Sequence, residues 1–321
     1  MKKSVMVFSA TGVAGTACVD EMLRMGSYQV VILQRSSGQL EKTSYRPITD
    51  QDKKQAQLDK WLAQGVEIRT ADATSVQALI PAMAGIDYLV SCAPMTATES
   101  QYPLIWAAKE AGVERFIPSE FGNIYEWEQY LPTDTIHRQV ARQKVFIKRV
   151  IELAGLDYTI IPAGLWPEFF MLEPVAIIGD ADARTAWSTG ADLGRIIPHV
   201  LAHPASRNAV CPVAATAYCS WNELLDAREK TLGRKIERHS PSPEQWRAAY
   251  AQETNEAMKM LLGIGVAGTE CPEGMPLSAN WNGLHLPEFK GTPLAMLFPE
   301  YIEPFVAALK STLQADSEAQ D

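Results

Sequence analysis

The sequence predicts an α/β protein, with a Rossmann-type doubly wound parallel sheet followed by a smaller C-terminal α+β part. Two observations support this fold class. Short apolar runs alternate with stretches of helical i, i+3, i+4 spacing over the first half of the chain. Such alternating units imply parallel strands with helices on both faces. A turn of small residues also separates the first apolar run from the first helical stretch.

The strands and helices of the first half follow one another in regular order. The strands are expected at Val5–Phe8, Gln29–Leu33, Glu67–Arg69, Tyr88–Ser91, Arg115–Ile117 and Tyr158–Ile161. The helices are expected at Gly12–Met25, Gln51–Gln64, Ser75–Ala82, Glu99–Ala111 and His137–Ala154. A ligand crevice is then expected at the carboxyl ends of the strands.

The alternation stops after Trp166, where proline and glycine become denser. Residues 1–165 are therefore expected to form one domain, and residues 166–321 a smaller part that is intertwined with it and covers the crevice. The segment Gly263–Asn282 is expected to be either a flexible lid or a passive loop. Helices are expected in the second part at Ala191–Leu201, Trp221–Leu232, Pro243–Leu262 and Glu300–Leu313.

The turn after the first strand has the order of a dinucleotide-binding fingerprint. A strand, a tight turn and a helix bring backbone N–H groups and a helix N-terminus to a pyrophosphate. Gly12 and Gly15 match the later glycines of the fingerprint, whereas Ser9 stands where the first is expected. A serine can make this turn if its φ stays negative. Glycines also end strands for packing reasons alone. The residues expected to bind the cofactor here are Ser9, Thr11, Gly12, Val13, Ala14 and Gly15.

The end of the second strand predicts the type of dinucleotide. NAD-selective folds place an acidic residue there to bind the ribose 2′-hydroxyl, and this chain has none. Arg35 can instead pair with a 2′-phosphate in bidentate fashion, and Lys42 can add charge. The alternative is a solvated surface arginine. The pattern favours NADP(H) over NAD(H).

Two further strand ends are ambiguous. The residues Cys92, Ala93 and Pro94 follow the fourth strand, where small side chains let the ribose and nicotinamide pass close to the backbone. The same residues would also suit a plain β-turn. Asp72 follows the third strand, where its carboxylate either approaches the adenine or caps the next helix.

Composition excludes several classes of function. The chain has 321 residues, with 47% hydrophobic residues, 21% charged residues and a net charge of −9. An acidic chain is a poor ligand for nucleic acid or anionic membranes, and no apolar run reaches the roughly 18 residues of a membrane span. The five cysteines and five histidines show no metal-ligand spacing. We expect a cytoplasmic protein with reduced thiols and no metal.

One long run of residues resembles a known family. The run from Tyr102 to Gly122 contains the block Pro118-Ser119-Glu120-Phe121-Gly122, and it is similar to the isoflavone-reductase-like group of NmrA-like proteins. These are atypical short-chain dehydrogenases/reductases. The similarity covers about the first 200 residues. It extends to Lys144, to the segment 157–160 and to the segment 190–195.

The resemblance implies a Rossmann domain that binds NADPH and a small substrate-binding domain. Many family members reduce phenolic or other aromatic small molecules by hydride transfer, whereas the NmrA branch binds the dinucleotide without turnover and acts as a redox-linked regulator. The resemblance also implies that Lys144 contacts the nicotinamide ribose and serves as the acid/base. A partly desolvated lysine beside a cationic nicotinamide can have its pKa lowered toward neutrality. From spacing alone, Lys144 would be a surface residue of its helix.

The residues around the nicotinamide follow from the same resemblance. Ser119 and Phe121 are expected to border the ring, with Phe121 either stacking on it or only packing, and Glu120 is expected to have a structural role. Most short-chain dehydrogenases have a tyrosine four residues before the lysine, but Val140 stands there in this chain. That difference disfavours a nucleotide-sugar epimerase.

Aromatic and apolar residues near the strand ends suggest a flat, apolar substrate. Such residues are more often part of a core. His137 lies seven residues before Lys144, so both could share one helix face; a lone histidine there is more often a cap or a surface residue. The residues expected to contact the substrate are Met95, His137, Trp166, Phe169 and Phe170.

Two functions therefore remain open. The first is an NADPH-dependent reductase of a small apolar, aromatic or conjugated compound, in which Lys144 assists proton transfer. The second is a non-catalytic NADP(H)-sensing regulator that acts through a protein partner. Neither predicts binding to nucleic acid or membrane, and either a monomer or a homodimer is compatible with the sequence.

Overall fold

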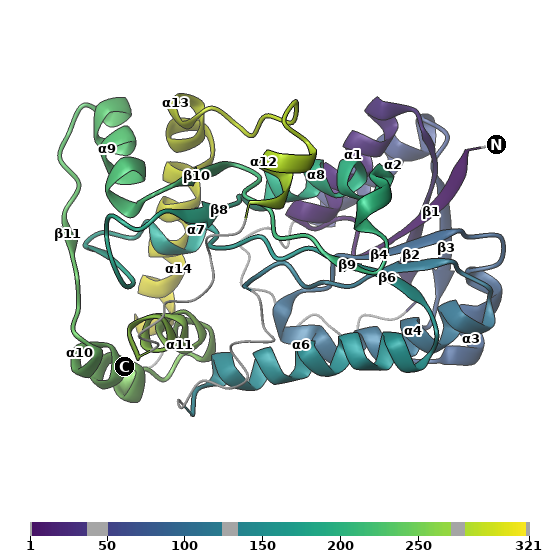
Figure 1. The fold of residues 1–321 in the computed structure, drawn as a ribbon, viewed down its shortest axis with the longest axis horizontal. Coiled ribbons are helices and arrows are strands. Elements are labelled where there is room, and N and C mark those ends of the chain that lie inside the picture. Colours follow the sequence, from purple (N-terminus) through teal and green to yellow (C-terminus); the bar gives the residue numbers. More distant parts are fainter. Residues whose placement is uncertain (1, 37–50, 124–133, 271–279, 319–321) are drawn as a thin grey trace. The chain divides into compact units, whose positions relative to one another are not determined.

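The computed structural model describes residues 2–36, 51–123, 134–270 and 280–318 (Figure 1). It divides the chain into two compact units. Unit 1 comprises Met1–Phe121, Arg142–Pro162 and Gly190–Pro212, and unit 2 comprises Gly122–Ala141, Ala163–Thr189 and Val213–Asp321. The chain thus passes between the units several times. The predicted division into domains at residue 165 stays a prediction.

Unit 1 is built around a seven-stranded sheet in the order β3-β2-β1-β4-β5-β6-β9. Every neighbouring pair in this sheet is parallel. The order reverses between β1 and β4, as in doubly wound folds, so the predicted fold class is confirmed. The strands are β1 (Lys3–Phe8), β2 (Tyr28–Arg35), β3 (Glu67–Ala71), β4 (Tyr88–Ser91), β5 (Arg115–Ile117), β6 (Asp157–Ile160) and β9 (Ala209–Val210).

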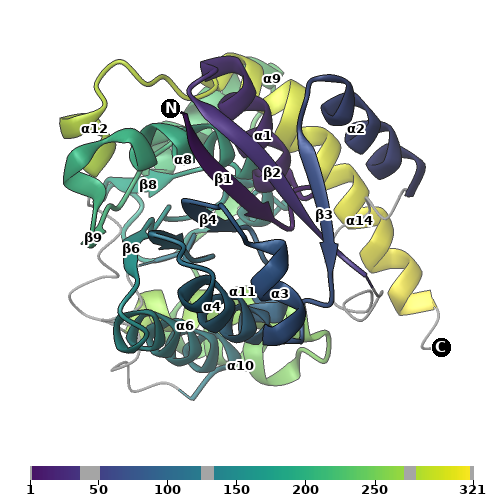
Figure 2. The same cartoon turned by 90° about the vertical axis from the view of Figure 1, so that its right-hand side faces the viewer.

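Strand β9 was not predicted, because it has two half-buried residues and no periodic pattern. The helices of unit 1 lie on both faces of its sheet. Figure 2 shows α1 and α8 on one face and α3, α4 and α6 on the other. Their bounds are α1 (Val13–Met25), α2 (Gln51–Ala63), α3 (Val76–Ala82), α4 (Gln101–Glu110), α6 (Ile136–Leu153) and α8 (Gly190–Ala202), with 3-10 turns at Met95–Ser100 and Pro204–Ser206.

Helices α1 and α8 pack closely because small residues meet between them. A side chain at Gly194 would collide with the backbone oxygen of Ala14. The Tyr28 hydroxyl donates a hydrogen bond to the Pro198 carbonyl at 3.1 Å. His199 Nε2 lies 2.6 Å from Glu21 Oε1, which joins the two helices by a polar contact. The position of α1 is therefore fixed along much of its length.

Unit 2 has a core of its own, in which Trp187 and Trp221 meet edge to face at 4.7 Å. Its helices are α7 (Pro167–Phe170), α9 (Trp221–Leu232), α10 (Pro243–Gln252), α11 (Glu256–Glu270), α12 (Trp281–His285), α13 (Leu294–Leu297), the π-helical turn Phe298–Ile302 and α14 (Glu303–Glu318). Two short two-stranded sheets pair β7 (Val175–Ala176) with β11 (Arg238–His239) and β8 (Thr185–Trp187) with β10 (Ala217–Cys219).

The predicted single helix Pro243–Leu262 is wrong. Helix α10 ends at Gln252, and α11 begins after Asn255, whose side chain accepts a hydrogen bond from the Met258 N–H at 3.2 Å. An asparagine that caps in this way starts a new helix. The predicted loop or lid at 263–282 is wrong for residues 263–270, which belong to α11; residues 271–279 lie outside the described part of the chain.

A buried arginine holds three segments of unit 2 together. The Arg228 side chain on α9 is fully buried. Its Nε donates to Glu303 Oε1 at 2.8 Å, its Nη1 donates to the Met171 carbonyl at 2.9 Å, and its Nη2 lies 3.4 Å from Glu173 Oε1. A buried charge requires such partners. We call Arg228, Glu173 and Glu303 the arginine cluster.

Candidate active site

The turn between β1 and α1 has the form of a dinucleotide-binding turn. Ser9 adopts φ = +57°, so the condition of a negative φ, under which a serine was expected to make this turn, is not met. The first position of the turn requires the left-handed conformation, which glycine adopts without strain and which costs other residues free energy. The Gly12 N–H donates to the Ser9 carbonyl at 3.3 Å and closes the turn.

Gly15 allows the helix to approach the turn. A Cβ atom at this position would lie 2.5 Å from the Ser9 oxygen, so any side chain would push α1 away. Gly12 is the N-cap of α1 and makes no side-chain capping bond. The turn therefore leads into a close-packed helix N-terminus, and Gly12 has no side chain that could bond the first N–H groups of α1. Backbone N–H groups at a helix N-terminus suit a pyrophosphate.

The end of β2 lies beside this turn in the sheet order, and the end of β3 follows next to β2. Arg35 is the last residue of β2 and its side chain is exposed; Lys42 lies outside the described residues. The Asp72 carboxylate accepts hydrogen bonds from the Thr74 hydroxyl at 2.7 Å and from the Thr74 N–H at 2.9 Å. These bonds lower the pKa of Asp72 below its ordinary value. Asp72 is not the cap of α3, because Ser75 makes that bond by accepting from the Ala78 N–H at 3.3 Å; its approach to the adenine stays a prediction.

Ser119 joins the ends of β4 and β5, because each of its polar groups bonds a different segment of unit 1. Its hydroxyl donates to the Ala93 carbonyl at 2.7 Å, and its N–H donates to Gln101 Oε1 at 2.8 Å. Its carbonyl accepts a hydrogen bond from Lys144 Nζ at 2.9 Å. Both Ser119 and Lys144 are buried. We call Ala93, Gln101, Ser119 and Lys144 the Ser119 junction.

The Ser119 junction brings predicted residues together and adds one that the sequence analysis missed. The predicted residues Ala93, Ser119 and Lys144 meet there, and Lys144 is not the surface residue that its spacing alone suggested. Gln101 was not predicted. Its signal is a polar residue on the buried face of α4, which otherwise contains Leu104, Ile105 and Ala108. A polar side chain inside such an apolar stripe points to a specific buried bond.

The remaining predicted residues of unit 1 flank this junction in sequence. Cys92 is half-buried at the end of β4, Pro94 is exposed, and Phe121 is buried at the end of the Pro118–Gly122 block. Met95 opens the 3-10 turn before α4 and is exposed. The contacts of these side chains with a ligand stay predictions.

His137 lies in unit 2, and its side chain is buried. It is neither a surface residue nor the cap of α6. The capping bond is made by Thr135, whose hydroxyl accepts from the Arg138 N–H at 3.2 Å. A side chain at Gly263 of α11 would approach the His137 Cβ to 3.1 Å, so His137 packs closely against α11. Its contact with a substrate stays a prediction.

The predicted aromatic residues of unit 2 divide into two groups. Trp166 and Phe169 stack at 6.0 Å, and Phe169 meets Phe305 of α14 edge to face at 5.4 Å. Phe170 instead faces Trp221, at 6.3 Å, and belongs to the border of the core of unit 2. Trp166 and Phe169 are therefore better candidates for a substrate wall than Phe170.

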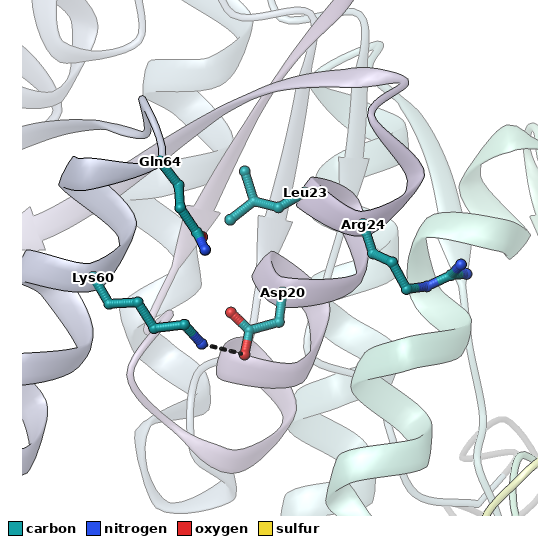
Figure 3. A pocket seen from close by; sticks show the side chains of 5 residues that line it. All are labelled: Asp20, Leu23, Arg24, Lys60 and Gln64. Atoms are coloured by element: carbon teal, nitrogen blue, oxygen red, sulfur yellow. Dashed lines mark ion pairs between the residues drawn. The ribbon is translucent and has the colours of Figure 1, made fainter.

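A surface depression of about 440 Å³ lies elsewhere in unit 1, between α1 and α2 (Figure 3). Three of its four polar side chains have partners on α1 or α2. Asp20 accepts from the Trp61 indole N–H at 2.6 Å and lies 3.6 Å from Lys60 Nζ, and Arg24 is paired with Glu21. These residues are away from the carboxyl ends of the strands, so we do not assign the depression to the active site.

Membrane-spanning helices, metal sites and disulfides are absent among the described residues. No helix among them is long and apolar enough to cross a membrane. No group of three or more His, Cys, Asp or Glu residues in the described ranges could hold a metal ion. The cysteines that the structure describes, at positions 18, 92, 211 and 219, form no disulfide with one another.

Comparison with known proteins identifies relatives over most of the chain. A family model described as the NmrA-like family matches residues 1–264. An isoflavone reductase from Pisum sativum is 26% identical over 258 residues, which cover 76% of this chain and 80% of that protein.

Solved structures share the fold. AtPrR2 with NADP+ and (+)pinoresinol has a TM-score of 0.77 and 22% identity, and the match covers 95% of this chain and 99% of that one. The binary complex of leucoanthocyanidin reductase and NADPH from Vitis vinifera has a TM-score of 0.74 and 21% identity, with 93% and 99% covered.

Proposed function

This chain belongs to the NmrA-like family, and from that premise we propose that it is an NADPH-dependent reductase of a small aromatic or conjugated compound. The observation that supports this most directly is the Ser119 junction. It holds the buried amine of Lys144 at the carboxyl edge of the sheet, where β4 and β5 end. Strand β4 is the neighbour of β1, which leads into the dinucleotide-binding turn. Substrates of open α/β sheets bind at this edge.

The residues present fit an NADP(H) cofactor. The turn Ser9–Gly15 would hold the pyrophosphate, and Arg35, with Lys42, would bind the 2′-phosphate. Residues 92–94, Ser119, Phe121 and Lys144 would border the ribose and nicotinamide. When bound, the cofactor supplies the hydride. That a relative with NADP+ and another with NADPH share the fold supports this assignment.

Lys144 would manage the proton that accompanies the hydride. Its ammonium can protonate a substrate oxygen as negative charge develops there, or its neutral amine can take a phenolic proton. Because Val140 stands where a tyrosine acid would be expected, the lysine has no such tyrosine to assist it. The junction keeps the amine in place, and its burial excludes water from the transfer.

The substrate is inferred from the relatives and from the aromatic side chains. The names of the relatives include an isoflavone reductase, and one matched structure contains (+)pinoresinol. We infer that the stacked rings of Trp166 and Phe169 contact a planar substrate ring; Met95, His137 and Phe170 are proposed as further substrate contacts. Apolar walls with a few polar groups are typical of small-molecule sites.

The test is transfer of deuterium from 4-deuterated NADPH to a panel containing an isoflavone, pinoresinol, a phenylcoumaran and a quinone. We expect label in at least one product. Lys144→Met should lower the rate measured at saturating NADPH by about a hundredfold or more. Lys148→Met is the matched control, because Lys148 lies one turn further along the same helix and is partly exposed beside Glu152.

The alternative function gives a different result in the same experiment. A non-catalytic NADP(H)-sensing regulator would bind NADPH tightly and transfer no label to any compound in the panel or in a cell extract. That outcome, or full activity of the Lys144→Met variant, would overturn the reductase mechanism.

A further inference from the structure

Gln101 has an unusual position for an amide side chain. It is the first residue of α4, and its side chain is fully buried. Its Oε1 accepts a hydrogen bond from the Ser119 N–H at 2.8 Å, and its Nε2 donates to the Thr98 carbonyl at 3.4 Å. The shorter bond joins α4 to the segment that follows β5.

Packing alone does not explain an amide at this position. The buried face of α4 continues with Leu104 and Ile105, and a methionine at position 101 would fill a similar volume. Burying an amide is unfavourable unless its polar atoms are bonded. The feature that an apolar residue would lose is the acceptor for the Ser119 N–H.

Ser119 transmits this bond to Lys144. The Gln101 acceptor fixes the peptide group on the N-terminal side of Ser119. On the other side, the Glu120 N–H donates to the Pro118 carbonyl at 2.8 Å, which fixes the peptide whose carbonyl oxygen receives Lys144 Nζ. The Ser119 hydroxyl, bonded to Ala93, prevents rotation of the whole residue.

We propose that Gln101 is a positioning residue for proton transfer: by accepting the Ser119 N–H, it holds the carbonyl that orients the Lys144 ammonium. The chemical role rests on the proposed reductase function. The positioning of Lys144 by Gln101 through Ser119 does not depend on that function. Gln101 acts on the reaction through Ser119 and Lys144 and touches neither substrate nor cofactor.

The first test is a pair of substitutions at position 101. Gln101→Met removes the acceptor and leaves a buried N–H without a bond, so Ser119 should shift and carry Lys144 with it. We expect single-turnover deuteride transfer at saturating NADPH to slow by about ten- to a hundredfold. Gln101→Glu, assayed at acidic pH where a buried carboxyl stays neutral, keeps both an acceptor and a donor and should restore most of the rate.

A matched control separates this effect from the loss of any glutamine. Gln143 precedes Lys144 in α6, and its Nε2 makes a long contact of 3.5 Å with Glu99. Gln143→Met should leave the transfer rate unchanged. If Gln143→Met slows transfer as much as Gln101→Met, the proposal is wrong.

A double-mutant cycle then distinguishes positioning from general stabilisation. If Gln101 acts through Lys144, Gln101→Met should have almost no further effect on the rate in a Lys144→Met background, because the group that it orients is gone. If the two losses multiply, Gln101 acts independently of Lys144 and the proposal is overturned.

A measurement without substrate keeps the proposal testable if no reductase activity is found. The NMR spectrum of protein labelled at the lysine ε-carbons contains a Lys144 signal, which is assigned by its absence in Lys144→Met. Gln101→Met should shift this signal, and Gln101→Glu at acidic pH should return it close to the wild-type position. An unshifted signal in a folded Gln101→Met variant overturns the proposal. A shifted signal without hydride transfer to any compound would instead disprove the reductase function and leave the geometry in place.

Discussion

The Ser119 junction of unit 1 and the arginine cluster of unit 2 each surround a buried cation, but in different ways. Arg228 contacts two carboxylates and a carbonyl, which more than offset its single charge and occupy its planar donors. Lys144 donates to a backbone carbonyl whose residue is itself fixed by Gln101 and by Ala93. One arrangement neutralises a charge, and the other orients an amine.

This difference shows that burial alone does not identify a functional cation. A buried ion pair holds segments together, and breaking it is costly because a charge is left uncompensated. An amine oriented by a peptide group can still exchange a proton with a ligand. The comparison therefore predicts that substitutions in the arginine cluster change stability without changing the rate of chemistry, whereas those in the Ser119 junction slow the chemistry whatever they cost in stability.

The largest effect is expected from Arg228→Met. This substitution leaves Glu173 and Glu303 without their buried partner and should lower the free energy of unfolding by about 3–5 kcal/mol. Urea unfolding followed by tryptophan fluorescence measures it, since Trp187 and Trp221 lie in the core of unit 2. The single-turnover rate of deuteride transfer should not change while the protein is folded.

Arg234→Met is the matched control for that experiment. Arg234 also binds Glu173, at 2.6 Å, but its side chain is 49% exposed. Exposed ion pairs contribute about 1 kcal/mol or less, so the effect should be small. Equal effects of the two substitutions, or a slower reaction in Arg228→Met, would break the comparison.

A second effect is expected from Arg35, at the end of β2 in unit 1, and it concerns the affinity for the cofactor alone. If Arg35 binds the 2′-phosphate, Arg35→Ser should weaken NADPH binding by about 1.5–3 kcal/mol, which is the range for hydrogen bonds to charged groups. Isothermal titration with NADPH and NADH measures this. The Kd for NADH and the unfolding midpoint should be unchanged. Unchanged discrimination between the two cofactors would remove Arg35 from the site.

The sequence predicted unit 1 far better than unit 2, for physical reasons. In unit 1, regular crossover helices impose periodic apolar patterns, so every strand of the sheet except β9 was found. In unit 2, the break between α10 and α11 depends on one asparagine cap, and the glycines of α11 serve close packing. Local sequence does not distinguish such glycines from those of a loop.

The candidate site was predictable where it follows a motif. Lys144, Ser119 and the turn at Ser9–Gly15 came from strand-end positions and from family resemblance. Gln101 was missed because its role depends on a contact with Ser119, which lies 18 residues away in sequence. The sequence left the φ of Ser9 open, because the turn, not the residue type, determines its backbone conformation.

A third effect concerns how the stability of the protein depends on pH through Glu21, a residue of unit 1 outside the Ser119 junction. Hydrogen bonds from Arg24 and then from His199 lower the pKa of Glu21 to about 2, against an ordinary value of 4.5. A carboxyl with a lowered pKa stabilises the fold above its unfolded pKa, and this stability is lost as pH falls from about 4.5 toward 2. Because Arg24 is largely exposed, we expect about 1–2 kcal/mol.

Urea unfolding of Glu21→Gln between pH 7 and pH 3 checks this prediction. The difference from wild type should be largest at neutral pH and should shrink below about pH 4.5. Glu110→Gln, which changes an exposed residue of α4, is the control. A constant difference at all pH values would mean that Glu21 contributes no linked proton. Deuteride transfer should be unaffected, since Glu21 joins α1 to α8 and is not part of the Ser119 junction.

The smallest effect is expected from Ser9→Gly. It tests whether the left-handed conformation of Ser9 in the dinucleotide-binding turn lowers the stability of the protein. The left-handed conformation of Ser9 costs about 1–2 kcal/mol, and glycine returns about 0.5–1 kcal/mol of that as unfolded-state entropy. The substitution should therefore stabilise the protein by about 0.5–1 kcal/mol in urea unfolding.

Asn208 is the control for this prediction. It shares the left-handed conformation, with φ = +53°, but its side chain accepts from the Tyr158 N–H and donates to Asp157. Asn208→Gly should therefore destabilise the protein. If Ser9→Gly stabilises the protein and Asn208→Gly destabilises it, the strain at Ser9 is not offset by a local bond. Destabilisation by Ser9→Gly would mean that the serine side chain stabilises the turn.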